Sequence, residues 1–518
     1  MTTEKPASSG EPGFQKRLGL FDATMLVTGS MIGSGIFIVS ADISRDVGST
    51  GWLMLVWVLT GVMTVMGALS YAELSAMMPQ AGGQYVYLRE SYSPLWGFLY
   101  GWTVFLVIQA GSIAAVAVAF AKFLGVLVPS LGTENVLLEI KNLDISIRGT
   151  LPWMNEPLTF FERKTFTISA GQLVAVAVTA LLTWLNCRGV NHGRWIQNVF
   201  TVAKTIGLVL LIVLGVTVAA NAEIAAANWS NLWSGMFTTP RFEATQKLAP
   251  WGDFLPAMMV VGAAMVGSLF SADAWNNVTF TAGETQNPRR NLPLSLLIGT
   301  GLVIGLYLLA NLAYLAALPI NGDPEGATPL ERGIAHAKDD RVATAVLEQI
   351  SPNLGVSVMA IAIMISTFGC VNGMILMGAR LYYAMARDGL FFKSVGELSH
   401  RGVPTAGLVL QGIWSVLLVF SGTYSELLDY VIFAALLFYV LTVVGLFVLR
   451  RTQPNAERPY KAWGYPWIPG LYVVLCTAVM LDLLIVKPVY TWPGLIIVLS
   501  GIPVYFVWRH RSMSPIAK

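Results

Sequence analysis

The sequence predicts an all-α polytopic membrane protein with twelve transmembrane helices, in which helices 1–5 and 6–10 form a five-plus-five inverted repeat. Three observations lead to this prediction. Hydrophobic residues make up 55% of the 518 residues and charged residues only 12%, about half the charged share of a soluble domain. Apolar runs long enough to cross a membrane recur along the chain. Small residues interrupt the first and sixth runs at corresponding places, which is typical of secondary transporters built from inverted repeats.

Apolar runs bounded by charged and turn residues mark the twelve helices in order. Twelve spans of about 20 residues need roughly 240 residues, so the chain has room for connecting loops but not for a separate large domain. The runs cover residues 20–44, 51–78, 95–128, 168–187, 196–220, 254–285, 293–318, 353–379, 404–421, 425–449, 466–487 and 492–508.

We expect four regions along the chain. Residues 1–19 form a disordered cytosolic leader, because residues 1–13 are polar and lack the apolar core of a signal peptide. Residues 20–220 make up the first repeat with helices 1–5, and residues 254–450 the second repeat with helices 6–10. Residues 466–511 hold helices 11 and 12 and a short cytosolic tail.

The distribution of basic residues orients the chain. With the amino terminus inside, the cytoplasmic segments hold 19 of the 32 lysines and arginines. Most of the others lie in long loops, which count for little in the positive-inside rule. We therefore expect both termini in the cytoplasm.

Charge, cysteine and histidine content exclude several classes of function. The net charge is only +3, so the basic surface needed to bind nucleic acid is not expected. Cys187, Cys370 and Cys476 fall in or at the ends of apolar runs, which argues against a disulfide scaffold or a zinc site. The four histidines are scattered over loops and helix ends, so we expect neither a metal, nor a cofactor, nor an enzyme active site.

Helix 1 is interrupted by the run GSMIGSGIF. The break at Gly33 lies about 13 residues into the helix, roughly 20 Å at 1.5 Å per residue, past the middle of a hydrocarbon layer of about 30 Å. Unwinding there exposes the amide groups of residues 34–36, which attract a carboxylate, and the carbonyl groups around Ile32. The alternative is that Gly29 and Gly33 only permit close helix packing. A third glycine, Gly35, and the matching break in helix 6 favour binding.

Helix 6 is interrupted by GSLFSADAW at the corresponding place. The carbonyl groups of residues 270–272 would face helix 1 and accept hydrogen bonds from an ammonium group. A zwitterion held at both ends predicts an α-amino acid, or a small amine-bearing acid, as the ligand. Phe270 either packs in the core or covers this ligand. The side chain of the ligand would project toward helices 3, 6, 8 and 10, with Gln109, Ala272, Asp273, Asn372 and Leu436 as candidate contacts.

Four ionisable residues lie in or near the spans, where such groups are costly unless they pair, line water or carry function. Lys204 could replace a sodium ion electrostatically by bridging helix 1 carbonyl groups, or it could extend to the cytosolic interface. Asp273 could meet a cationic side chain, a substrate ammonium or Lys204, or it could only hold the broken backbone. Glu73 and Glu284 either form gating ion pairs or lie at the interface.

Several motifs follow one another in a specific order and spacing. With them the chain resembles the amino acid/polyamine/organocation superfamily and, within it, the L-type amino acid transporter family, from about Leu18 to Tyr460. The motifs are GSGIF (33–37), YAEL (71–74), PQAGGQY (79–85), NCRGV (186–190), AK (203–204), DAWNN (273–277), GE (283–284), NPRRNLP (287–293), STFGCVNG (366–373) and ARDG (386–389).

The resemblance implies a twelve-helix transporter with helices 1 and 6 unwound, working by alternating access as a sodium-independent exchanger of amino acids. By position, residues 34–36 resemble the carboxylate binders, and Ile32, Phe270 and Ser271 the amine binders. Lys204 resembles the helix 5 lysine at the vacant sodium position. The substrate-binding set that we expect is Ile32, Gly33, Ser34, Gly35, Ile36, Phe270, Ser271, Ala272, Asp273 and Asn276, with Lys204, Phe270, Asp273 and Glu73 in coupling or gating.

Two departures from the family pattern bear on partners. Animal members are linked to a heavy-chain glycoprotein by a cysteine between helices 3 and 4, and residues 129–167 contain no cysteine. We therefore expect no disulfide-linked heavy chain, and a prokaryotic protein of the inner or plasma membrane whose partners are amino acid substrates and lipid. Residues 129–167 and 321–352 are also longer than usual for the family and have no assigned role.

Two other functions stay open at this point. A proton-coupled symporter of the same architecture could use Asp273, Glu73 or Lys204 as its proton site. A membrane sensor that binds amino acids without transporting them usually carries a sizeable cytosolic output segment, and the polar tails here span about 19 and 10 residues.

Overall fold

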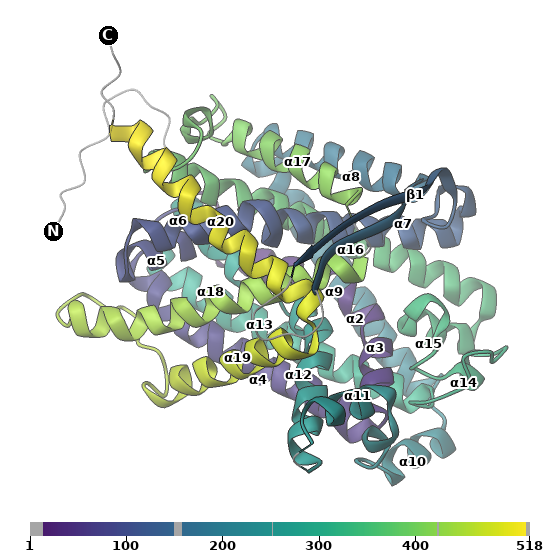
Figure 1. Ribbon diagram of the computed structural model, residues 1–518. Helices are drawn as coiled ribbons and strands as arrows, with labels where there is room; N and C mark the ends of the chain where they lie inside the picture. The colour runs from purple at the N-terminus through teal and green to yellow at the C-terminus, as the bar shows by residue number, and fades with distance from the viewer. Residues whose placement is uncertain (1–13, 150–157, 251, 422–423, 514–518) are drawn as a thin grey trace.

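The computed structural model describes residues 14–149, 158–250, 252–421 and 424–513, which form a bundle of long helices with one β-hairpin (Figure 1). Eleven helical segments in these ranges are long and apolar enough to cross a membrane. The expected polytopic membrane protein is thus confirmed. At the expected ninth span, α17 (Thr405–Val419) has only 15 residues, or roughly 22 Å. The count of twelve spans and the inverted repeat stay predictions.

The long helices follow the apolar runs of the sequence. In chain order, the remaining ones that are not interrupted are α4 (Thr50–Met77), α8 (Ala170–Cys187), α9 (Val190–Thr217), α13 (Pro288–Ala317), α16 (Pro352–Arg387), α18 (Tyr424–Thr452), α19 (Trp467–Val486) and α20 (Pro488–Met513). Short elements connect them: α5 (Gln84–Ser91), α10 (Ala222–Ser230), α11 (Pro240–Leu248), α14 (Pro329–Arg332), α15 (Val342–Ile350), and 3₁₀ turns at Pro129–Leu131, Gly235–Thr238, Lys338–Asp340 and Lys393–Gly396.

Helix 1 is broken where the sequence predicts. It consists of α1 (Leu20–Met31), α2 (Gly35–Ile38) and α3 (Ser40–Val47), with residues 32–34 outside the helical pieces. We call the end of the bundle where α1 begins the proximal face and the other end the distal face. Because α1 packs against α9, α13 and α16, the break lies inside the bundle.

Helix 6 is broken as well, which confirms the second predicted interruption. α12 (Phe254–Ser271) ends, and a 3₁₀ segment (Trp275–Glu284) continues after three residues. Ala274 has a φ of 64°, a left-handed conformation that is uncommon for a residue with a Cβ. Such strain persists only where the surrounding structure enforces it.

Helix 3 also departs from a regular helix. Between α6 (Pro94–Thr103) and α7 (Gln109–Leu127), residues Val104–Ile108 form a π-helical turn. Such turns occur frequently at functional sites. The side chain of Gln109, directly after this π-helical turn, accepts a hydrogen bond from Asn277, close to the break in helix 6.

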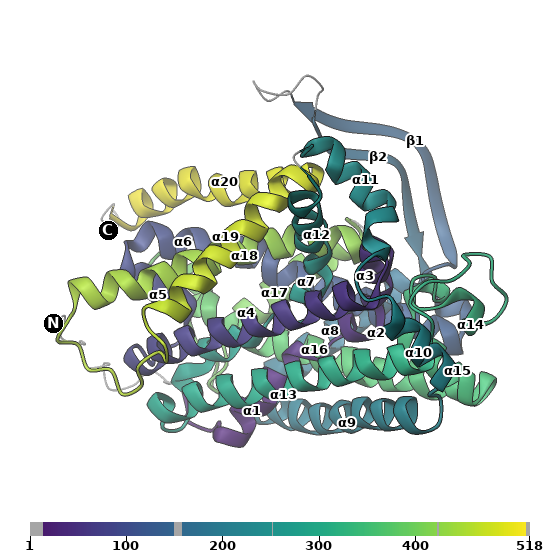
Figure 2. The same cartoon turned by 90° about the horizontal axis from the view of Figure 1, so that it is seen from below.

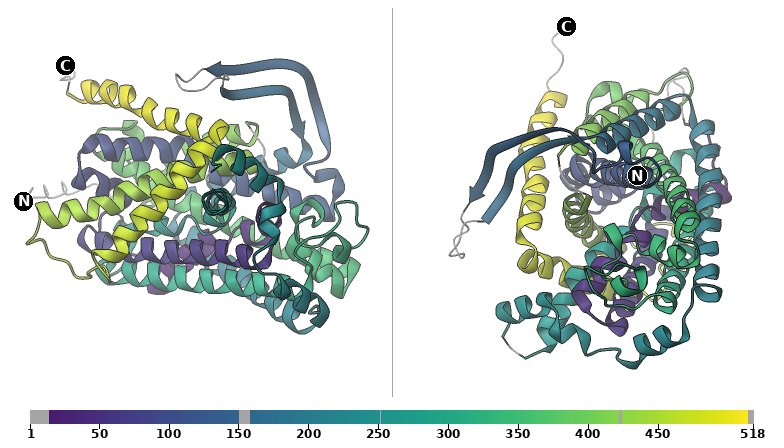
Figure 3. Two further views of the ribbon diagram at one scale, coloured as in Figure 1. Left: turned by 60° about the horizontal axis from the view of Figure 1, so that its bottom comes forward. Right: turned by 90° about the vertical axis from the view of Figure 1, so that its right-hand side faces the viewer.

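A β-hairpin joins helices 3 and 4, where we had no structural expectation beyond an all-α protein. Strands β1 (Val136–Gly149) and β2 (Leu158–Ser169) pair antiparallel. Figures 2 and 3 show the hairpin along the outside of the bundle near the distal face, and β2 contacts α20. The hairpin ends at Ser169, whose hydroxyl accepts from the amide of Gln172 (3.2 Å) and so caps α8.

The end of the expected leader lies against the proximal face. The amide groups of Arg17 and Leu18 both donate to the carbonyl oxygen of Glu284 (2.9 Å each), and the amide of Gln286 donates to that of Leu18 (2.8 Å). Leu18 is fully buried. The chain just before α1 is therefore joined to the segment between helices 6 and 7.

Candidate binding site between the helix breaks

A buried lysine fills the break in helix 1. The Nζ atom of Lys204 donates to the carbonyl oxygens of Ile32 (2.7 Å) and Ser366 (3.3 Å), and also to that of Gly29. Lys204 is only 2% exposed, so the interpretation that it extends to the interface is wrong. Its ammonium group meets the carbonyl ends of α1, where the helix dipole attracts a cation.

Helix 8 supports the same break from its other side. The hydroxyl of Ser366 in α16 lies within hydrogen-bond distance of the carbonyl oxygens of Ile32 (3.1 Å) and Gly33 (3.0 Å). The Sγ atom of Cys370 donates to Ser30 (3.0 Å). The carbonyl of Ile32, expected to bind an amine, is thus already engaged by Lys204 and Ser366.

One tyrosine connects the two breaks. The hydroxyl of Tyr307 in α13 lies 2.9 Å from the carbonyl oxygen of Met31 and 3.0 Å from that of Ser271. Helices 1 and 6 lie against each other at Gly35, where an added Cβ would lie 2.1 Å from the Oγ atom of Ser271. Because this space admits no side chain, glycine is required at the start of α2.

The break in helix 6 is held mainly by its own backbone. The amide of Ala272 donates to Ser268 (3.0 Å), and that of Asp273 to Phe270 (3.1 Å). The carbonyl groups of Phe270 and Ser271, two of the expected amine binders, therefore lie at the helix end, beside the break in helix 1. Phe270 itself is buried in the last turn of α12, and its gating role stays a prediction.

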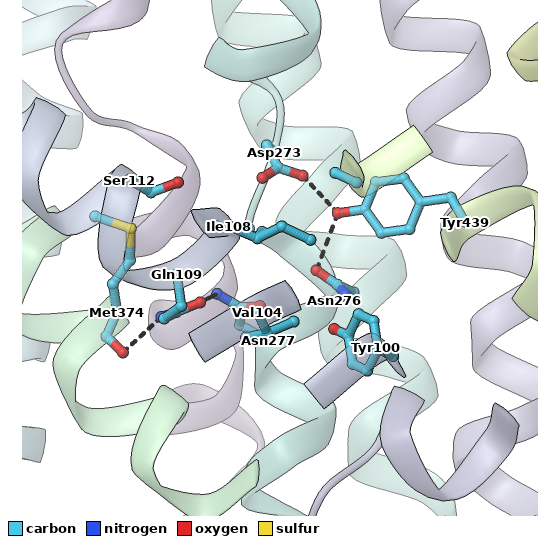
Figure 4. A pocket seen from close by; sticks show the side chains of 12 residues that line it. Tyr100, Val104, Ile108, Gln109, Ser112, Asp273, Asn276, Asn277, Met374 and Tyr439 are labelled. Carbon is cyan, nitrogen blue, oxygen red and sulfur yellow. Dashed lines mark hydrogen bonds between the residues drawn. The ribbon is translucent and has the colours of Figure 1, made fainter. Parts of the chain in front are cut away.

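Asp273 is engaged by a tyrosine from helix 10. The hydroxyl of Tyr439 in α18 donates to the carboxylate of Asp273 and also lies 3.2 Å from Oδ1 of Asn276 (Figure 4). Asn276 in turn donates to Gln84 (2.7 Å). Asp273 and Lys204 thus have separate partners, and the carboxylate lies on the helix 3 and helix 10 side of the break.

Two small cavities meet at Asp273. Their volumes are about 10 and 20 Å³, the space of roughly one water molecule each. The first is lined by Tyr100, Val104, Ile108, Gln109, Ser112, Asp273, Asn276, Asn277, Met374 and Tyr439, among others (Figure 4). The second is lined by Met63, Thr64, Leu269, Ala272, Asp273, Trp275, Ile432, Leu436, Tyr439, Tyr472 and Cys476, among others. An amino acid fits neither, so binding requires helices to move apart.

The expected side-chain contacts divide into two groups. Gln109 lines the first cavity, and Ala272 and Leu436 line the second, as expected for a pocket around Asp273. Asn372 instead bonds to the carbonyl of Gly193 (3.0 Å) and to Gln197 (3.1 Å), and so ties helix 8 to helix 5. It lines neither cavity, and its contact with the substrate side chain stays a prediction.

The two glutamates form ion pairs near the proximal face. Glu284 pairs with Arg380 at 3.0 Å, and both side chains are 1% exposed. Glu73 accepts from Arg450, lies 3.2 Å from Arg458, and also accepts from a backbone amide of the segment before α19. The ion-pair interpretation of both glutamates is confirmed, while their gating role stays a prediction.

The sequence did not identify the residues that are distant along the chain and form hydrogen bonds at the breaks. Tyr307, Ser366 and Tyr439 come from helices 7, 8 and 10, and no local pattern marks them as partners of the breaks. Tyr439 could have been noticed, because it lies three residues after Leu436 and therefore on the same helix face. Among the described residues, no cluster of three or more metal-ligand side chains occurs.

A family model described as an amino acid permease matches residues 18–507. The chain belongs to this family. The large neutral amino acids transporter small subunit 2 of Rattus norvegicus is 31% identical over 518 residues, covering 98% of this chain and 84% of that protein. The same subunit of Homo sapiens is 31% identical, covering 98% and 84%. The b(0,+)-type amino acid transporter 1 of Mus musculus is 28% identical, covering 97% of this permease and 91% of the relative.

Proposed function

We propose that this permease is a sodium-independent amino acid exchanger that works by alternating access. The observation that carries the proposal is the ammonium group of Lys204 within the break of helix 1, on the carbonyl oxygens of Gly29, Ile32 and Ser366. A fixed cation there supplies the charge that a bound sodium ion would otherwise bring. Transport then needs no sodium gradient, and exchange of one amino acid for another resets the carrier.

The substrate that this site supports is a free amino acid. Since α2 begins at Gly35, the first amide groups of that helix have no acceptor within it and favour a carboxylate. The carbonyl groups of Phe270 and Ser271 favour the amine, and each also accepts a hydrogen bond within the protein, from the amide of Asp273 and the hydroxyl of Tyr307. We give the carbonyl of Ile32 a smaller part than the family resemblance implies, because it already meets both the hydroxyl of Ser366 and the positive charge of Lys204.

The two faces of the bundle differ in how they are closed. Buried ion pairs and the segment at Leu18 close the proximal face. At the distal face, the described residues of α7, α15 and the turn at Lys338–Asp340 line a cavity of about 360 Å³. By the distribution of basic residues, the proximal face is cytoplasmic.

We further propose that the chain works without a disulfide-linked partner. The hairpin segment, residues 129–167, contains no cysteine. Cys370 and Cys476 are buried, and Cys187 lies at the proximal end of α8. None of the three is placed to form a disulfide at the distal face.

Uptake into proteoliposomes tests the proposal. Labelled amino acid should enter only vesicles preloaded with unlabelled amino acid, with the same rate in sodium, potassium or choline buffer. Accumulation by empty vesicles under an inward proton gradient would show a proton symporter instead. Binding of amino acid to the purified protein without uptake in either format would show a sensor.

A further inference from the structure

A carboxyl group in the distal half of helix 11 is not used by the site described above. Asp482 lies near the end of α19, and neither of its buried carboxylate oxygens has a hydrogen-bond partner. In a membrane helix an ionisable side chain is expected to pair, to line water or to carry function. The carboxylate of Asp482 has no hydrogen-bonded partner, so pairing does not account for its place in the helix.

The carboxyl group of Asp482 packs directly on the backbone of helix 6. A Cβ built on Gly262 of α12 would lie 2.3 Å from Oδ2 and 3.0 Å from Cγ of Asp482. The amide groups in the middle of α12 are bonded within the helix, so this contact gives the carboxyl no donor. Because Gly262 has no side chain, it leaves a space on α12 that the carboxyl group of Asp482 fills.

Few of the helices packed near Asp482 carry an ionisable residue close to it. Neither α12 nor the distal half of α4 contains an ionisable residue. Arg241 of α11 contributes charge at Asp482, and its Nε lies 3.4 Å from Asp46 of α3. Two further elements contact α19, namely α18 and α20. Their titratable residues at the distal end are Tyr424, Glu426, Asp429, Tyr430 and Tyr490, whose side chains lie outside those described, and Lys487 follows α19 itself.

This geometry favours the neutral acid over the carboxylate. Asp482 is half-buried as a residue, but both of its carboxylate oxygens are buried without a donor. A carboxylate in this position is costlier than a carboxyl group, because no hydrogen bond replaces the water that its oxygens lose. We propose that Asp482 is a proton-binding site in the distal half of the protein, protonated while α12 packs against α19. Its proton passes to water when the two helices separate and solvent reaches the carboxyl group.

The proposal gives the distal opening step a dependence on pH, and this link to transport rests on the exchange function proposed above. Proton binding and the packing of α12 on α19 favour each other, so acid on the distal side stabilises the closed contact. Raising the distal pH favours the carboxylate and thus the separated helices. The outward-opening step should therefore slow as the distal pH falls.

Distances between spin labels on α12 and α19 test the proposal without transport. Leu255 and Ile485 are 41% and 56% exposed, so each accepts a label after replacement by cysteine in a Cys187→Ser background. In lipid nanodiscs we expect the longer distance to be populated at least about fivefold more at about pH 8 than at about pH 5.5. Asp482→Asn, which cannot ionise, should keep the shorter distance at both.

Two further variants separate Asp482 from its surroundings. Burial raises the pKa of Asp46 while Arg241 and Lys487 lower it, so Asp46 is the competing titrating group, and Asp46→Asn should keep the wild-type response. Gly262→Ala, which removes the space for the carboxyl group, should show the longer distance at both pH values. An unchanged pH response in Asp482→Asn, or none in the wild-type sequence, would overturn the proposal.

Exchange measured with only the distal pH varied links the site to transport. The wild-type rate should fall at least about fivefold toward acid, and that of Asp482→Asn should not change with pH. A wild-type rate independent of distal pH would overturn the inference about the opening step. Complete absence of exchange would instead overturn the proposed function, while the distance measurement still tests the proton site.

Discussion

The two helix breaks are fastened in different ways. At helix 1, side chains from helices 5, 7 and 8 bond directly to the exposed carbonyl groups, with Lys204 supplying a positive charge. At helix 6, the exposed end is held mainly by its own backbone and by Tyr307, and it carries an acidic side chain, Asp273, bonded to Tyr439.

From this difference we expect the two breaks to have different tasks. A break whose carbonyl groups are already bonded can present its amide end in a fixed geometry, as binding a carboxylate requires. A break whose single carboxylate is held by the hydroxyl of Tyr439 and a neighbouring backbone amide can exchange the hydroxyl for a part of the substrate. We therefore expect helix 1 to determine that a substrate binds at all, and helix 6 to discriminate between side chains.

The largest effect is expected at the fixed break. Lys204→Met leaves the carbonyl group of Gly29 without its buried donor and that of Ile32 with the hydroxyl of Ser366 as its remaining donor. An unsatisfied buried group costs about 1–3 kcal/mol. We expect exchange in proteoliposomes to fall by roughly 100-fold or more, with a lower melting temperature. Lys122→Met is the matched control, because Lys122 makes one backbone bond, at the distal end of α7 (2.8 Å). Wild-type exchange by Lys204→Met would refute the assignment.

A smaller but still large effect is expected where the two breaks meet. Gly35→Ala places a methyl group 2.1 Å from Oγ of Ser271, and overpacking of this kind costs about 1–3 kcal/mol. Exchange should fall by roughly tenfold, and the double variant Gly35→Ala/Ser271→Gly should recover part of it. Gly301→Ala in α13 is the control, since nothing lies within 4 Å of that added Cβ. Equal effects of the two alanines would show that the breaks do not need to touch.

The third test addresses side-chain selectivity at helix 6. If Asp273 exchanges its tyrosine partner for a cationic substrate, Asp273→Asn should weaken arginine-like substrates by roughly tenfold, because hydrogen bonds to charged groups contribute about 1.5–3 kcal/mol. Leucine-like substrates should change much less, and Asp273→Glu should retain part of the preference. Competition by the twenty amino acids against one labelled substrate measures this. Equal loss for both classes would contradict the role.

The smallest effect has the opposite sign. Tyr439→Phe removes the hydroxyl that engages Asp273 and leaves the carboxylate available to a cationic side chain. A hydrogen bond to a charged group contributes about 1.5–3 kcal/mol, and water reaching the freed carboxylate offsets part of this, so the preference for arginine-like over leucine-like substrates should rise by roughly fivefold. Tyr382→Phe is the control, because the buried hydroxyl of Tyr382 has no hydrogen-bond partner. An equal decrease for both substrate classes would mean that Tyr439 only supports the fold.

Much of the architecture could be predicted from the sequence because it depends on local features. Membrane spans follow from runs of apolar residues, and both helix breaks follow from glycines and small residues at one depth. The β-hairpin was not predicted, since a two-stranded unit outside the bundle has no signal comparable to a span. The short α17 shows the limit of the same method, because hydropathy marks a span without fixing where its helix ends.

The partners of the functional groups required the tertiary structure. Sequence alone showed that Lys204 and Asp273 lie within spans and must pair or act. It could not show that Lys204 bonds to a carbonyl 172 residues away, or that Asp273 accepts from a tyrosine 166 residues away. Local composition determines where backbone can unwind, whereas the packing of distant helices decides which side chain reaches the unwound backbone.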